Sequence, residues 1–145
     1  MMQAIEVYRR SFRASDQLDR PYVMLGFNVI AADTDEQARY LSTSRQQAFL
    51  NLRRGRPSRL PPPSDQVEMA PGEEAMLRGA LSCSAVGSPE TVRRELAAFI
   101  DRTRPDELII ASQIYDHEAQ LRSYEITADA RDALSTEGFR PQPAG

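Results

Sequence analysis

The apolar residues of this chain fall into three short runs separated by longer amphipathic segments. The first run, residues 22–32, is apolar on both faces apart from Asn28, and the other two cover residues 82–86 and 108–111. Continuous apolar runs of this length are typical of strands that are buried on both faces. Apolar residues at helical spacing follow each run, over residues 34–54, 91–103 and 118–136. This pattern predicts an α/β fold of about three parallel β-α units.

The segment around the second run carries the clearest local signals. Gly87 ends the run at a point where the chain can turn without a Cβ penalty. Ser88 is placed to cap a helix, with Pro89 at the first helical position and Glu90 in the positive first turn. The apolar residues that follow line one helical face: Val92, Leu96, Phe99 and Ile100. A strand–helix–strand unit of this length predicts a right-handed crossover in a parallel sheet.

The remaining segments complete a single domain over residues 1–145. Short helices are expected over residues 4–12 and 73–81, on either side of the first strand and its helix. Residues 55–72 contain too many prolines and glycines for regular structure. Gly138 should cap the last helix, and residues 138–145 should form a flexible tail. The last helix should turn one apolar face to the sheet, made of Leu121, Tyr124 or Glu125, Ala128 and Leu134.

Composition removes several classes of function. The net charge of -3 gives no electrostatic footprint for nucleic acid or an anionic membrane. All 18 basic residues are arginine, so lysine Schiff-base chemistry is excluded. No apolar stretch is long enough to cross a membrane, and the N-terminus lacks the apolar core of a signal peptide. We therefore expect a cytoplasmic protein.

Cys83 and His117 are the only cysteine and the only histidine. A single cysteine excludes an internal disulfide and a multi-cysteine metal site, so no metal is expected. The two residues could form a nucleophile–base pair if the fold brought them together. A buried small thiol and a surface imidazole are the favoured interpretation.

Three groups of polar residues leave alternatives open. Asn28 could line a ligand cavity, although bonding within the sheet is favoured. Ser88, with the amides of Glu90 and Thr91, could bind an anion, although a simple helix cap is favoured. A cluster of arginines near the end of the helix over residues 34–54 could bind phosphate, although a solvated basic helix terminus is favoured. Its members are Arg45, Arg53, Arg54, Arg56 and Arg59.

Three stretches, in order, carry a resemblance to a known family. They are MLGFNVIAADTDEQA at residues 24–38, VGSPETV at residues 86–92 and DELIIAS at residues 106–112, the last followed by Asp116 and by LRS at residues 121–123. Together they resemble the bacterial-luciferase-like flavin-dependent monooxygenases. The resemblance spans about residues 8 to 130.

The resemblance implies a partial (β/α)8 TIM barrel, in which this chain matches only the C-terminal part of a family member. It implies reduced flavin mononucleotide (FMN) or a deazaflavin as cofactor, together with a small-molecule substrate. Ser112 and Gln113 would lie near the isoalloxazine pocket, and residues 53–74 would form a lid over the active site. The catalytic histidine of the family and most of its flavin-phosphate ligands belong to earlier strands. His117 does not match the catalytic position, so the catalytic residues of this chain are unknown.

Without those strands, the chain alone is expected to be weakly active or inactive, and it could lack bound flavin altogether. The alternative is a non-catalytic α/β module that forms a homo-oligomer or completes a barrel with a partner chain. Exposed strand edges and apolar faces favour self-association, so we expect the protein not to be a monomer. A third possibility, an unrelated small α/β binding protein, would be favoured by antiparallel strands or by a sheet closed into a small barrel.

Overall fold

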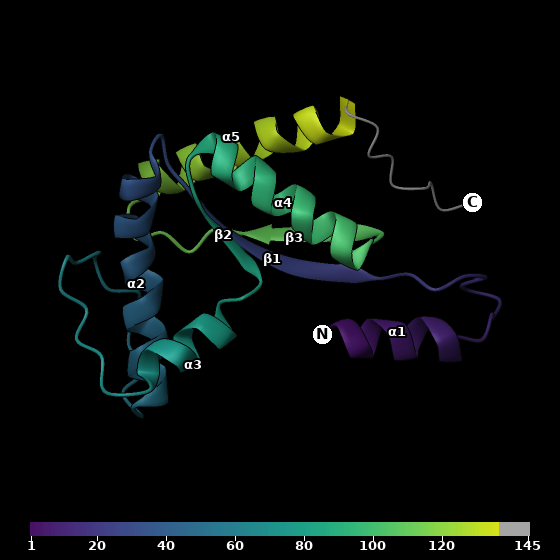
Figure 1. Cartoon of the computed structure of the whole chain (residues 1–145), viewed down its shortest axis with the longest axis horizontal. Coiled ribbons are helices and arrows are strands. Elements are labelled where there is room, and N and C mark those ends of the chain that lie inside the picture. The colour runs from purple at the N-terminus through teal and green to yellow at the C-terminus, as the bar shows by residue number, and fades with distance from the viewer. Residues whose placement is uncertain (137–145) are drawn as a thin grey trace.

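The computed structural model describes residues 1–136 as three parallel strands and five helices (Figure 1). The flexible tail expected over residues 138–145, and the cap expected at Gly138, lie outside the described residues. The elements are, in chain order, α1 (Met2–Ser11), β1 (Met24–Ala31), α2 (Asp35–Arg53), α3 (Glu73–Ala80), β2 (Ser84–Gly87), α4 (Pro89–Thr103), β3 (Glu107–Ala111) and α5 (His117–Thr136).

The predicted elements are all present, with ends shifted by a few residues. The predicted strand over residues 22–32 is shorter, since β1 covers only Met24–Ala31. Both strand pairs are parallel, which confirms the α/β layer and counts against the antiparallel alternative. Among the described residues no helix is long and apolar enough to cross a membrane.

The order of the strands in the sheet is β2-β1-β3. Asn28 of β1 lies opposite Ser84 of β2 on one side and opposite Ala111 of β3 on the other. Three consecutive strands of a barrel would instead lie side by side in sequence order. The sheet is therefore parallel as predicted, but its strand order differs from that of a continuous arc of a barrel, because the first strand is central.

One face of the sheet, here called the closed face, is covered by α4 and α5 (Figure 1). Phe27 of β1 packs against Phe99 of α4 with 4.4 Å between the ring centroids. Val29 of β1, Val92 of α4 and Ile126 of α5 are almost completely buried in the same cluster. This cluster is the main hydrophobic core of the described chain.

The apolar face predicted for α5 is correct at Leu134 and wrong at its other positions. The residues that α5 buries are Ser123, Ile126, Thr127, Ala130 and Leu134, whereas Leu121 is 50% exposed. The reason is that the buried hydroxyls are satisfied, so a polar residue can occupy the packed face. Ser123 Oγ accepts a hydrogen bond from the Ala31 amide at 3.0 Å, and Thr127 Oγ1 donates to the Ser123 carbonyl at 2.7 Å.

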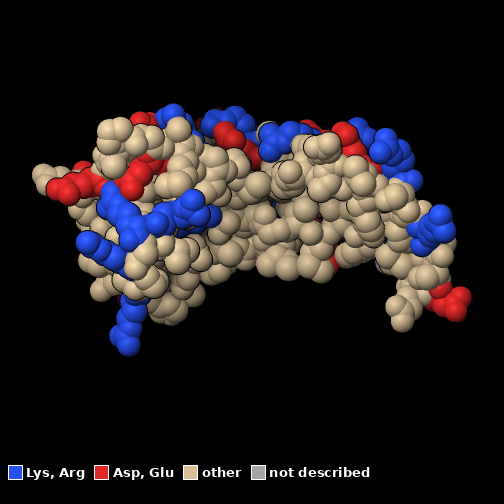
Figure 2. Space-filling view, turned by 90° about the horizontal axis from the view of Figure 1, so that it is seen from below, with Lys and Arg blue, Asp and Glu red and all other residues tan. Residues whose placement is uncertain are grey.

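The opposite face of the sheet, here called the open face, is covered only near the carboxyl ends of the strands. There Ile30 of β1 packs against Ala38 and Leu41 of α2. Nearer the amino ends, Met24 and Ile109 point to the same side and are 50% and 53% exposed. Figure 2 shows the underside of the molecule, where charged side chains gather toward the two ends and along one margin and the centre is almost free of them.

Hydrogen bonds tie two peripheral segments to the rest of the chain. The Arg9 guanidinium of α1 donates to the carbonyl of Thr103 at 3.1 Å and to that of Arg104, which ties α1 to the end of α4. The proline-rich connection between α2 and α3 runs along α2. Its attachments include hydrogen bonds from Gln47 to the Pro62 carbonyl, from Tyr40 to the Pro63 carbonyl and from the Ser64 amide to Thr43.

Candidate functional site

The carboxyl edge of a parallel sheet is where α/β proteins commonly place their ligand groups, and Ser112 follows β3 at this edge. Its amide donates to the Tyr124 hydroxyl at 3.2 Å, and its hydroxyl donates to Ser123 Oγ at 3.0 Å. Its carbonyl accepts from the side chain of Gln120 at 2.6 Å. Ser112 is buried, so its side chain holds α5 against the sheet and does not face solvent.

The neighbouring residue is placed differently. Gln113 is exposed at the carboxyl edge, and its side chain has no hydrogen-bond partner within residues 1–136. Of the two residues expected near a flavin, only Gln113 therefore presents a side chain that a ligand could reach directly.

An ion pair that the sequence did not predict lies beside them. Asp33 follows β1, and its Oδ1 accepts hydrogen bonds from Arg122 Nε at 3.1 Å and from the terminal guanidinium nitrogen at 2.8 Å. The hydrogen bond to Asp33, followed by that to Glu125, raises the pKa of the Arg122 guanidinium. Both side chains of the pair are exposed, so the pair contributes little stability. It links α5 to the loop that follows β1 at this edge. The separation of 89 residues left no local signal for it.

The N-terminus of α4 is occupied by groups of this chain. Ser88 Oγ accepts from the Thr91 amide at 3.4 Å, which confirms the helix cap. The Asp35 carboxylate of α2 accepts from the Ser88 amide at 2.7 Å. That backbone hydrogen bond, then those from the side chains of Thr91 and Ser88, lowers the pKa of Asp35. A carboxylate of the chain itself therefore sits where an external anion would bind.

Gly87 is needed at this junction because of space. A Cβ at Gly87 would lie 2.5 Å from Thr91 Cγ2 and 2.6 Å from Asp35 Oδ1. The sequence suggested that a glycine is needed here for a turn, but the φ of Gly87 is not in the left-handed region. Conformational freedom is therefore not the reason for the glycine. The missing side chain lets Asp35 approach the start of α4.

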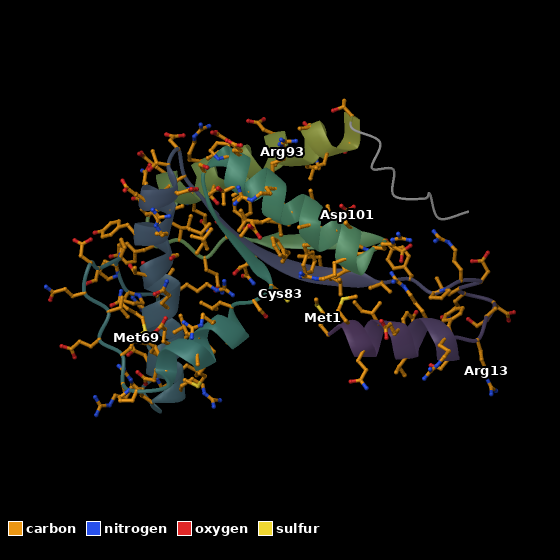
Figure 3. All side chains as sticks on the ribbon, viewed as in Figure 1. Met1, Arg13, Met69, Cys83, Arg93 and Asp101 are labelled. Carbon is orange, nitrogen blue, oxygen red and sulfur yellow. The ribbon has the colours of Figure 1, made fainter. Side chains whose placement is uncertain are left out.

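Cys83 and His117 are not brought together. Cys83 precedes the amino end of β2, where its Sγ lies 3.7 Å from the sulfur of Met1 (Figure 3). His117 is exposed at the start of α5, beyond the carboxyl end of β3. The two residues thus lie at opposite edges of a parallel sheet. The thiol is half-buried and not fully buried as expected, and residues 1–136 contain no cluster of groups that could hold a metal ion.

The favoured interpretation of Asn28 holds for its backbone but not for its side chain. Its backbone amide bonds within the sheet, donating to the Cys83 carbonyl at 3.1 Å. Its side chain has no hydrogen-bond partner in the described part of the chain and lies on the same side of the sheet as Ser84. The half-buried carboxamide therefore faces the open side at the centre of the sheet.

The five arginines near the end of α2 do not converge on one point. Arg54 pairs with Glu73 at 2.9 and 2.5 Å and donates to the Glu68 carbonyl at 2.9 Å. The hydrogen bonds of this pair lower the pKa of Glu73 and raise that of Arg54. Three of the others, Arg53, Arg56 and Arg59, are exposed, which agrees with the favoured interpretation of a solvated basic helix terminus. Arg45 is the exception, because it lines a cavity.

That cavity has a volume of about 480 Å³ and lies between α2, α3 and the open face of β1 and β2. Three arginines, Arg39, Arg45 and Arg78, line it together with uncharged polar and apolar side chains. A second hollow of about 420 Å³ lies between α4, α5 and β3 on the closed side, and its lining includes Tyr124 and Arg131.

Comparison with known proteins places this geometry in context. The chain is 40% identical to a luciferase-like monooxygenase of Escherichia coli (strain K12) over 136 residues, which cover 92% of this chain and 41% of that protein. It is 45% identical to the uncharacterized protein YvbT of Bacillus subtilis (strain 168) over 128 residues, which cover 87% of this chain and 38% of YvbT. The chain thus spans about two fifths of the length of these relatives.

The fold has a counterpart among solved structures. The crystal structure of apo-MsnO8 matches 90% of this chain and 41% of its own chain, with a TM-score of 0.72 and 24% sequence identity. No protein-family model matches the chain.

Proposed function

This chain is related in sequence to the luciferase-like monooxygenases along 92% of its length, and we propose that it belongs to that family and acts as part of a flavin-dependent oxidoreductase. The observation that carries the proposal is the 40% identity over 136 residues. The parallel α/β fold and its likeness to apo-MsnO8 support it. The activity of a complete relative needs more than the two fifths of its length that this chain matches, so we expect little turnover from this chain alone.

A reduced flavin, FMN or a deazaflavin, would supply the oxygen chemistry, and the protein would position and shelter it. Gln113 fits a role at the carboxyl edge because its side chain is exposed and unpartnered within residues 1–136. Ser112 does not fit direct contact, because its hydroxyl is buried and bonded to Ser123. Its role would be to hold α5, and with it the Asp33–Arg122 pair, beside the flavin.

Residues 53–74 would act as the lid over this edge. In the described conformation the segment lies along α2 through the hydrogen bonds of Tyr40, Thr43 and Gln47. All three of these side chains are partly or largely exposed, so these contacts are weak enough to exchange with water during opening. Opening would also have to keep or break the hydrogen bonds of Arg54 to Glu73 and to the Glu68 carbonyl.

A second copy of this chain would cover the open face, as part of the same proposal. The half-exposed apolar side chains of Met24 and Ile109 lie on two adjacent strands, and within residues 1–136 no further strand pairs with the outer edges of β2 and β3. Apolar faces and unpaired strand edges promote association. A second copy would place its own strands and apolar side chains against these surfaces.

The test is a titration of the purified protein with oxidised and with reduced FMN, followed by flavin fluorescence and calorimetry. The proposal predicts saturable binding in the micromolar range, weakened by Gln113→Ala. Leu121→Ala, at an exposed residue of α5, is the control and should bind like the wild type. The absence of binding up to millimolar flavin would contradict a flavin site on this chain.

A further inference from the structure

The cavity between α2, α3 and the open face has an unusual balance of charge for an acidic chain. Ten residues line it; three of them are arginines and none is acidic. The whole chain carries a net charge of -3, so this local excess of positive charge runs against the average. Figure 2 shows basic side chains gathered at the end of the underside that α2 and α3 form.

Arg45 is the central feature of the cavity. Its side chain is about half buried, and no hydrogen bond or ion pair to it is found within residues 1–136. Burial lowers the pKa of this guanidinium, which still remains protonated at neutral pH. Partial desolvation of a cation that has no partner is unfavourable, and a bound anion would offset it.

The neighbouring polar groups on α2 also favour the binding of an anion. Arg39, Ser42, Arg45 and Gln46 are spaced by three, three and one residues, which places them on one stripe of the helix. The Gln46 amide donates one hydrogen to Ser42 Oγ at 3.1 Å, and the same amide nitrogen keeps a second hydrogen for a ligand. Arg78 of α3, which pairs with Glu74, faces this stripe across the cavity.

The other side of the cavity is apolar. Ile30 and Val86 contribute from the sheet, and Leu77 and Leu81 contribute from α3 and its end. A ligand that matches both sides would carry an oxyanion on an apolar body. The volume lies in the range of about 300–1,000 Å³ that is typical of small-molecule sites.

We propose that this cavity binds an organic phosphate monoester, with the phosphate held by Arg45, Arg39 and the Gln46 amide and the organic part lying on the apolar wall. Guanidinium groups suit this role because they donate paired hydrogen bonds to phosphate oxygens. The site rests on the cavity alone and does not depend on the proposed function.

Calorimetry with phenyl phosphate, inorganic phosphate and phenol tests both halves of the site. Phenyl phosphate should bind more tightly than inorganic phosphate, and phenol should not bind measurably. Arg45→Gln should weaken phenyl phosphate by about tenfold or more, since it removes a charged hydrogen-bond donor. Arg45→Lys should retain part of the affinity. Arg53→Gln is the matched control, because Arg53 is exposed on the same helix and does not line the cavity.

The variants also separate binding from folding. Arg45→Gln should melt no lower than the wild type without ligand, because it replaces a half-buried charge that has no partner within residues 1–136. The proposal would be overturned by the absence of phenyl phosphate binding to the wild type, or by equal binding to folded Arg45→Gln. Phenyl phosphate contains no flavin, so either result is independent of the flavin titration. Loss of FMN binding but not of riboflavin binding in Arg45→Gln would support the site and identify FMN as one source of the phosphate.

Discussion

The two faces of the sheet are built from alternate residues of the same strands, yet they are completed in different ways. On the closed face, Phe27, Val29 and Ala31 of β1 are buried by α4 and α5. On the open face, Ile30 is buried by α2, but Met24 and Gly26 are exposed. The closed face therefore supplies the folding core, and the open face holds the cavity and the surface available to ligands and other chains.

The helices of the two faces meet at one junction. Asp35 begins α2 on the open side, and its carboxylate accepts from the Ser88 amide at the start of α4 on the closed side. Gly87 leaves the space for this contact. The junction links the helices of the two faces, which also meet where Ala119 of α5 packs against the cluster of Ala38 and Leu41.

The largest expected effect separates the two faces directly. Phe99→Ala removes a side chain that is 2% exposed on the closed face and should lower the free energy of unfolding by about 3–5 kcal/mol. Ile109→Ala, on the open face, should lower it by less than about 1 kcal/mol at low protein concentration. Urea unfolding measures both. Equal losses for the two variants would contradict the difference between the faces.

A smaller effect is expected at the junction. Gly87→Ala places a Cβ against Thr91 and Asp35, so one of these elements must shift. We expect a loss of about 1–3 kcal/mol in unfolding free energy from this overpacking. Gly26→Ala is the control in the neighbouring strand, because a Cβ there would have no atom within 4 Å. A Gly87→Ala protein as stable as Gly26→Ala would show that the junction is looser than described.

The smallest effect concerns the charge of Asp35. Its pKa is lowered in the folded chain, so the ionised carboxylate stabilises the fold above the unfolded pKa near 3.8, and this contribution is lost as the pH falls through the lower folded pKa. Asp35→Asn should therefore be less stable than the wild type at neutral pH, and the difference should shrink below about pH 4. Asp129→Asn, at an exposed residue of α5, should follow the wild type throughout. A difference that is constant from neutral to acidic pH would mean that the charge has no role.

The parts of the fold that were predictable depend on neighbours in the sequence. The cap at Ser88, the proline at the first position of α4 and the apolar runs of the strands all act over a few residues. The strand order and the packed face of α5 depend on residues far apart, such as Ser123 bonding to Ala31. Hydropathy alone placed Leu121 on the buried face because it cannot show that a serine hydroxyl will find a partner.

The candidate site shows the same difference between interactions of sequence neighbours and interactions of distant residues. The resemblance in the sequence pointed to Ser112 and Gln113, which lie at the carboxyl edge of the sheet. Only the contacts of Ser112 with α5 show that its side chain supports the helix and that the side chain of Gln113 is the one a ligand could reach. Arg45 was grouped with the arginines at the end of α2. Its separation from them depends on α3 and the sheet, which close the cavity around it.

The central claim is that another copy of this chain completes the open face, and the molar mass in solution tests it most directly. Light scattering over a wide concentration range should give at least twice the chain mass of 16.3 kDa. Ile109→Glu should lower the mass toward that of a single chain, whereas Leu121→Glu, an exposed residue of α5, should not. A wild-type mass of 16.3 kDa at every concentration would contradict the claim.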